Sequence, residues 1–166
     1  HWMVHSFPTR RSSDLEIIFM PHVTMCTPST RPGAGFVDPA CWQNREADPT
    51  SLRLEFDGMK GRSWLMKWLP ARAYDNGVYV VFSNPIGMDD DQVRNGCSMI
   101  IDPFGDILTE CRSFDDSIST CTIIPEKLQQ SGGHRYIQAR RPGLYRDIIG
   151  QDHTPNQQVI WMPAKK

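Results

Sequence analysis

The sequence predicts a mixed α/β fold, and three observations support this prediction. Val78 to Phe82 is a nearly continuous apolar run, which is typical of a strand buried on both faces. Before it, apolar residues between Trp64 and Ala73 recur at spacings of three and four, as on one face of a helix. After it, two strand-like runs flank a turn at Asp102–Gly105 and predict a hairpin. Strand, helix, strand and hairpin in this order indicate layers stacked on a sheet.

The expected elements of the first half follow from local patterns. The apolar run at residues 17–21 ends in proline and predicts a buried strand. Residues 24–50 are rich in Pro, Gly, Thr and Asp and lack a period, so we expect a long loop. The helix is expected to be capped at its start by Asp57, to kink at Pro70, and to end at Asn76-Gly77.

The second half is expected to contain further strands and one short helix. Residues 97–101 and 106–111 form the two arms of the hairpin, and residues 117–123 alternate polar and apolar side chains as a third strand does. Pro125 is expected to open a helix that ends at Gln130. A last edge strand is expected at residues 158–162.

Composition argues against several classes of function. The net charge is −1, which favours neither nucleic acid nor an acidic membrane surface as partner, and no apolar run approaches the roughly 20 residues of a membrane span. The five cysteines form no CxxC pair, so we expect free thiols in a reduced cytoplasm, with no zinc site and no cofactor. Asp89 to Asp91 are adjacent carboxylates that point in different directions, as in a solvated loop.

The first residues stand apart from the rest. Residues 1–15 have no apolar segment of the secretory type, and their SFPTRRSSDL stretch resembles translated sequencing adapter. We therefore expect an artefactual or disordered leader at 1–15, a domain portion at 16–150 and a tail at 151–166. Folded structure is expected to begin abruptly at Glu16, in the middle of a strand, as it would in a fragment of a larger domain.

Five short motifs follow one another in a particular order. They are IIFMP at 17–21, ARAYDN at 71–76, GCS at 96–98, DPFGD at 102–106 and RRPGLY at 140–145. Each is weak alone, but together with the strand 78–82 and Asn84 they resemble the second half of a carbon–nitrogen hydrolase domain of the nitrilase superfamily. This resemblance implies half of a stacked α–β–β–α sandwich, with the N-terminal half missing.

The resemblance also implies a chemistry. The family hydrolyses non-peptide carbon–nitrogen bonds with a Glu–Lys–Cys triad, in which Glu accepts the thiol proton, the thiolate attacks carbon and Lys stabilises the oxyanion. The family pattern places all three upstream of Pro21, so we expect no catalytic residue in this chain and no activity from it alone. An amide or N-carbamoyl compound is the expected substrate, with a nitrile second. The alternative is a non-catalytic binding or scaffold protein on the same half-fold.

The resemblance offers four substrate-side residues. Those predicted to bind substrate are Pro21, His22, Thr24 and Asn84. A structural role for His22, in which its imidazole forms a hydrogen bond with a loop carbonyl, is an equally good interpretation. For Asn84 a structural role, as a turn residue that organises the backbone near the pocket, is favoured over direct contact with substrate.

Further candidates have a structural interpretation beside the functional one. Cys41-Trp42 resembles the dipeptide at the family's nucleophile, but it follows the proline-terminated strand instead of preceding it, and lies in the expected loop. Trp64 and Trp68 are expected in the core or against a partner subunit, and Arg140-Arg141 is expected to anchor the terminal segment more than to bind an acidic substrate. The loop 24–57 is expected near the pocket mouth, where it would set substrate choice.

The resemblance predicts two properties of the assembly. The complete protein is expected to be a homo-oligomer that acts on a small molecule. The chain alone is expected to associate, because half a sandwich exposes apolar strand faces.

Overall fold

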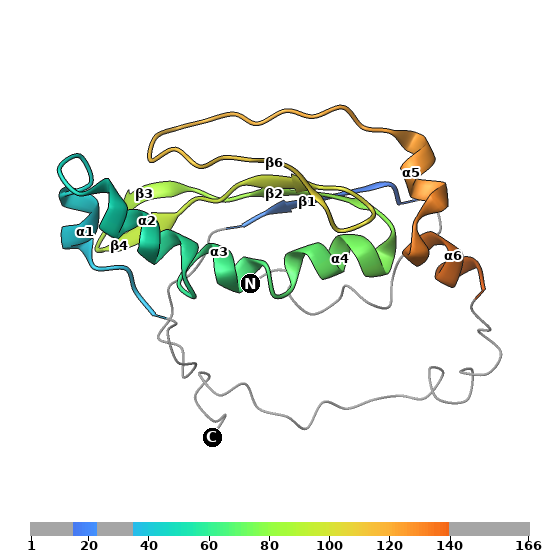
Figure 1. Cartoon of the computed structure of the whole chain (residues 1–166), viewed down its shortest axis with the longest axis horizontal. Helices are drawn as coiled ribbons and strands as arrows, with labels where there is room; N and C mark the ends of the chain where they lie inside the picture. Colours follow the sequence, from blue (N-terminus) through green and yellow to red (C-terminus); the bar gives the residue numbers. More distant parts are fainter. Residues whose placement is uncertain (1–14, 23–34, 140–166) are drawn as a thin grey trace, which may run out of the picture.

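A computed structural model describes residues 15–22 and 35–139 of the chain (Figure 1). Its elements, in chain order, are β1 (Ile17–Pro21), α1 (Pro39–Gln43), α2 (Pro49–Asp57), α3 (Arg62–Leu65), α4 (Leu69–Asn76), β2 (Tyr79–Ser83), β3 (Ile86–Asp89), β4 (Gln92–Asn95), β5 (Met99–Ile101), β6 (Ile107–Glu110), α5 (Pro125–Gln130) and α6 (Gly132–Gln138). The predicted mixed α/β class is confirmed.

The main sheet has four strands in the order β1-β2-β5-β6. β1 runs parallel to β2, and the other two pairings are antiparallel. The register aligns Phe19 with Val81, and Val81 with Ile100, so these side chains share one face. The hairpin of β5 and β6 and the apolar strand β2 therefore form as the sequence predicts.

One face of this sheet packs on helices. Figure 1 shows α3 and α4 lying along the sheet on one side. The residues of this first core are Leu65, Leu69, Ala73, Val78, Val80, Phe82, Cys97, Met99 and Ile101. Alternation along each strand directs every second side chain to the helices, so the chain supplies one α layer and one β layer of the predicted sandwich.

The predicted single kinked helix is wrong, because the segment after Asp57 forms two helices, α3 and α4. Asp57 is the last residue of α2, not the cap of a longer helix. The chain turns at Gly58–Gly61, where a Cβ on Gly61 would lie 2.2 Å from the Phe56 carbonyl oxygen. Pro70 occupies the first turn of α4, where a missing N–H costs nothing. Gly77 caps α4 with φ 58°, as predicted.

The predicted loop over residues 24–50 is also wrong in part. Residues 23–34 lie outside the described residues, but α1 and the start of α2 fall within the rest. Each helix begins with an Asp-Pro pair, in which the aspartate accepts a hydrogen bond from a backbone N–H: Asp38 from Ala40 and Asp48 from Ser51. Such pairs are helix start signals that the loop-like composition hides.

The aspartates at residues 89–91 are exposed, as expected, and they lie at the end of a hairpin. β3 and β4 form a second, two-stranded sheet, and Asp89 is the last residue of β3. Asp90, with φ 55°, makes the turn. This hairpin packs on α1 and α2 in a second core of Val37, Leu52, Phe56 and Val93.

Two other expectations differ from the structure. Residues 117–123 form no strand, and Ile118 is 93% exposed, so its alternation reflects no buried face. β1 was expected to be buried, but it lies at the edge of the described sheet and Phe19 is 70% exposed. α5 is confirmed, whereas α6 has no periodic signal in the sequence. The expected strand at 158–162 and the motif at 140–145 lie outside the described residues.

Candidate functional site

The predicted substrate-side residues lie where two parallel strands end. Pro21 closes β1 and pairs in register with Ser83 at the end of β2. The His22 backbone N–H donates to the Ser83 carbonyl at 2.8 Å, so His22 extends the ladder by one residue. Pro21, His22 and Asn84 thus share one edge of the sheet, while Thr24 lies outside the described residues. Side chains at the carboxyl ends of parallel strands commonly line binding sites.

His22 packs its ring among aromatic side chains. Its ring centroid lies 5.7 Å from that of Phe82 and 6.4 Å from that of Trp68. Burial lowers the pKa of His22 below its ordinary value, so the imidazole is neutral at pH 7. Its Nδ1 and the Nε1 of Trp68 are buried without a hydrogen-bond partner in the described structure. A neutral imidazole with an unpaired nitrogen can hold a polar group of a ligand.

The Asn84 side chain forms hydrogen bonds with neighbouring groups of the protein. Its side-chain amide donates to Asn95 Oδ1 at 3.0 Å and to the Gly96 carbonyl at 2.8 Å. Its backbone N–H donates to Ser98 Oγ at 3.0 Å, and Ser98 Oγ donates to the Asn84 carbonyl at 3.2 Å. These bonds tie the end of β2 to the β4–β5 connection, which supports the organising role over direct substrate contact.

Cys97 is a buried thiol that the sequence does not distinguish from other core residues. It is 5% exposed and contacts the Asn95 carbonyl at 3.4 Å. Burial raises the pKa of the Cys97 thiol to about 11, and the charge of Glu110 adds to this rise. Since the thiolate is the reactive form, Cys97 is not an activated nucleophile.

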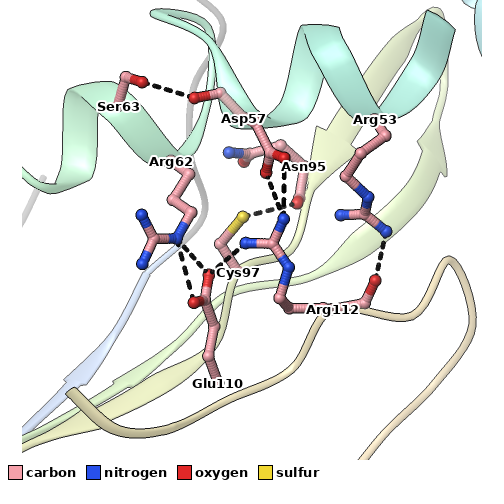
Figure 2. Close-up of polar contacts among 8 residues, drawn as sticks. All are labelled: Arg53, Asp57, Arg62, Ser63, Asn95, Cys97, Glu110 and Arg112. Atoms are coloured by element: carbon pink, nitrogen blue, oxygen red, sulfur yellow. Dashed lines mark hydrogen bonds and ion pairs between the residues drawn. The ribbon is translucent and has the colours of Figure 1, made fainter. Parts of the chain in front are cut away.

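A group of charged side chains lies beside Cys97 (Figure 2). Arg62 Nε contacts the two Glu110 oxygens at 2.8 and 3.0 Å, and Arg112 Nη2 contacts the two Asp57 oxygens at 2.7 and 2.8 Å. Arg112 also reaches Glu110 at 3.4 Å. Burial alone would lower the pKa of Arg112. The hydrogen bonds from Arg112 to Asp57 and the negative charges of Asp57 and Glu110 have a larger opposite effect, so the pKa of Arg112 is raised. We call these four residues the charge cluster.

Cys41 is not placed as a nucleophile on a strand end. It lies in α1, half-buried, and packs against the second core. The indole of its neighbour Trp42 stacks near Phe56, at a centroid distance of 6.4 Å. Cys41 therefore acts as a packing residue in the structure.

The described residues offer neither a metal site nor a membrane-spanning helix. Within residues 15–22 and 35–139, no group of three or more His, Cys, Asp or Glu side chains could hold a metal ion. No helix among the elements described is long and apolar enough to cross a membrane.

Comparison with known proteins assigns the chain to a family. The family model described as carbon-nitrogen hydrolase matches residues 44–132, more than half of the sequence, and the chain therefore belongs to this family. A similar protein is the glutamine-dependent NAD(+) synthetase of Aquifex aeolicus (strain VF5), 34% identical over 105 residues. That alignment covers 63% of this chain and 17% of the synthetase, so the chain matches about a sixth of its curated relative.

Solved structures of the same superfamily are also similar to this chain. The carbon-nitrogen hydrolase of Helicobacter pylori G27 is 18% identical, with a TM-score of 0.44 over 53% of this chain and 33% of that one. A CN-hydrolase superfamily protein of Xanthomonas campestris is 27% identical, with a TM-score of 0.37 over 58% of this chain and 32% of that one.

The charge cluster was missed by sequence reasoning. Arg62 and Glu110 are separated by 48 residues, and Asp57 and Arg112 by 55. Their pairing depends on how α2 and α3 pack beside β6, and no local spacing signals it. The Asn84 network was predicted only as a turn, because its partners come from the later β4–β5 connection.

Proposed function

We propose that this chain is part of an enzyme that hydrolyses the carbon–nitrogen bond of an amide or N-carbamoyl compound. The observation that carries the proposal is the carbon–nitrogen hydrolase match over residues 44–132. The similar synthetase is named as glutamine-dependent, which favours a side-chain carboxamide among the possible substrates. We place the Glu–Lys–Cys triad upstream of Glu16.

The described residues would then form one wall of the pocket. His22, neutral and with an unpaired Nδ1 in the described structure, would bind a polar group of the substrate, and Pro21 would flank it. Thr24, outside the described residues, keeps its predicted role in substrate binding. Asn84 would hold the end of β2 in place through its bonds to Asn95 and Gly96. The role of these residues is to bind and orient, since productive geometry supplies much of the rate enhancement in such reactions.

Neither Cys97 nor Cys41 suits the attacking step. Cys97 is buried with a pKa of about 11, and Cys41 packs on the second core. An upstream thiolate would attack the amide carbon, the Lys would stabilise the oxyanion, and ammonia would leave. Water would then hydrolyse the acyl–enzyme thioester.

Ammonia release tests the proposal. The 166-residue chain and the longest protein that contains it are assayed with glutamine, an N-carbamoyl amino acid and a nitrile. We expect ammonia only from the longer protein, with Cys41→Ser and Cys97→Ser leaving its nucleophile intact. Turnover by the chain that Cys41→Ser abolishes would overturn the placement of the triad. Preference for the nitrile would favour a nitrilase, and no turnover of any substrate by the longer protein would favour a binding or scaffold role.

The same longer protein tests the remaining expectations. We expect a homo-oligomer by size-exclusion chromatography with light scattering, and cytoplasmic localisation by fractionation. In it, His22→Phe should raise KM for the amide with little change in the thermal midpoint, because the ring packing is kept and the nitrogen is lost.

A further inference from the structure

The described structure contains two separate hydrophobic cores. The first core joins the main sheet to α3 and α4, and the second joins α1, α2 and the β3–β4 hairpin. Partly buried Trp42, Ile86 and Phe114 complete the second core. Figure 1 shows α1, α2 and the β3–β4 hairpin together at one end of the main sheet. No residue is shared between the two cores as described, so each is closed by its own side chains.

Among the segments that the structure describes throughout, four cross between the two cores. They are residues 57–62, 84–86, 95–98 and 110–114, and we call the region where they meet the seam. Two of them, 84–86 and 95–98, are joined by the buried bonds of Asn84 to Asn95, Gly96 and Ser98. The other two, 57–62 and 110–114, are joined by ion pairs of the charge cluster. One side of the seam is thus held by buried bonds and the other by partly exposed charges.

The ion-pair side is the weaker side. The side chains of Arg112 and Asp57 are 43% and 37% exposed, so water screens their attraction. Glu110 is only 10% exposed and is held by both Arg62 and Arg112. Opening at this side would return the charges to water and leave the Asn84 bonds unbroken.

Two features of the closed seam are unfavourable. Asn95 is 2% exposed, and its Nδ2 has no hydrogen-bond partner in the described structure. The turn at Gly61 approaches it so closely that a Cβ there would lie 2.8 Å from this nitrogen. Cys97 adopts φ 62°, a left-handed conformation that favours glycine. Opening would hydrate the Asn95 amide, which lowers the cost of leaving the closed state.

We propose that the two cores are bodies that hinge about the Asn84 bonds, and that the charge cluster closes the hinge over Cys97. Figure 2 shows the Cys97 thiol among the side chains of the charge cluster, so its reactivity reports whether the seam is open. Asn84 is also the residue that fixes the end of β2, beside His22. The hinge therefore couples the α1–α2–hairpin body to the strand ends of the candidate site. It does not depend on the proposed reaction.

Cysteine alkylation resolved by peptide mass spectrometry tests the hinge in the intact chain. Arg112→Met removes the pairs to Asp57 and Glu110, and Asp57→Asn removes one of them. The matched control is Lys60→Met, which breaks the Lys60–Glu55 pair at 2.6 Å on the same side of the seam. We expect Arg112→Met to speed Cys97 alkylation roughly fivefold, the factor for an exposed ion pair in an opening equilibrium, and Lys60→Met to leave it unchanged.

Hydrogen exchange separates hinge opening from global unfolding. Amides of β2 belong to the first core and should exchange at the wild-type rate in Arg112→Met, while Cys97 reacts faster. Adding Asp57→Asn to Arg112→Met should change nothing more, because the shared pair is already lost. If Arg112→Met unfolds the chain, Asp57→Asn alone serves as the test. Equal alkylation in Arg112→Met and Lys60→Met, or β2 exchange that rises in parallel with Cys97 reactivity, would overturn the hinge.

Discussion

Asp102 offers the sharpest test of how a family motif works in this chain. Its side chain is fully buried, and Oδ1 accepts hydrogen bonds from the backbone N–H of Phe104 at 2.9 Å and of Asp106 at 3.0 Å. Its Oδ2 accepts from Lys127 Nζ at 2.6 Å. One carboxylate therefore shapes the β5–β6 turn and anchors α5 to it.

The expected cost follows from these three contacts. Hydrogen bonds to a charged group contribute about 1.5–3 kcal/mol each, so the two backbone bonds alone predict that Asp102→Ala lowers the free energy of unfolding by about 3–6 kcal/mol. The Lys127 contact adds little to this, because water screens the partly exposed ammonium. Asp102→Asn keeps an oxygen for the two backbone donors but turns an N–H₂ group toward the Lys127 ammonium. Its cost should be smaller, and it should fall mainly on the docking of α5.

Urea denaturation followed by tryptophan fluorescence measures these changes. Two of the five tryptophans, Trp64 and Trp68, pack against the first core, so part of the emission reports its loss. Asp106→Asn is the matched control, because this side chain is exposed at the same turn and should change stability by less than about 0.5 kcal/mol. If Asp102→Ala lies as close to wild type as this control, the carboxylate does not organise the turn.

Three further predictions concern other parts of the chain. Because burial lowers the pKa of His22 from 6.5, the unfolded chain binds more protons than the folded chain, and the free energy of unfolding should fall as the pH drops below 6.5. His22→Phe should therefore make the urea midpoint depend less on pH between about pH 7.5 and 5.5. Phe19→Lys should reduce concentration-dependent light scattering, because Phe19 is 70% exposed on a sheet face, whereas Leu54→Lys, at 69% exposure on a helix, should not. Gly133→Ala should lower the thermal midpoint and cost about 1–3 kcal/mol, because its Cβ would meet the α4 C-terminal backbone at 2.3 Å, while Gly132→Ala, with nothing nearer than 3.6 Å, should be tolerated. An unchanged pH slope, equal scattering by the two lysine variants or equal melting of the two alanine variants would contradict them in turn.

The sheet was predictable because its signals are local. The run at β2 is apolar on both faces, and the turn at Asp102–Gly105 carries its own hydrogen-bonding side chain, so neither depends on distant residues. Helix boundaries were less predictable. The apolar stripe from Trp64 to Ala73 keeps its phase across α3 and α4, and periodicity alone does not reveal the break between them.

The candidate site was predictable only in part. The ladder bond from His22 to Ser83 places the strand ends together, as the resemblance implied. The aromatic surroundings of His22 depend on Trp68 from α3–α4 packing, which no spacing near residue 22 signals. The substrate-binding role of Pro21, His22, Thr24 and Asn84 stays a prediction.

Gly77, Asn84 and Asp102 lie within the residues that match the family, and they share a physical property. Gly77 has φ 58° and lies close to Gly133. The Asn84 amide donates hydrogen bonds to Asn95 and Gly96. The Asp102 carboxylate accepts a hydrogen bond within its own turn. Each is a position where backbone geometry dictates the residue. Substitutions at such positions should therefore lower stability and activity together. His22 is different, because its Nδ1 has no hydrogen-bond partner in the described structure, and a change there should affect substrate binding more than stability at pH 7.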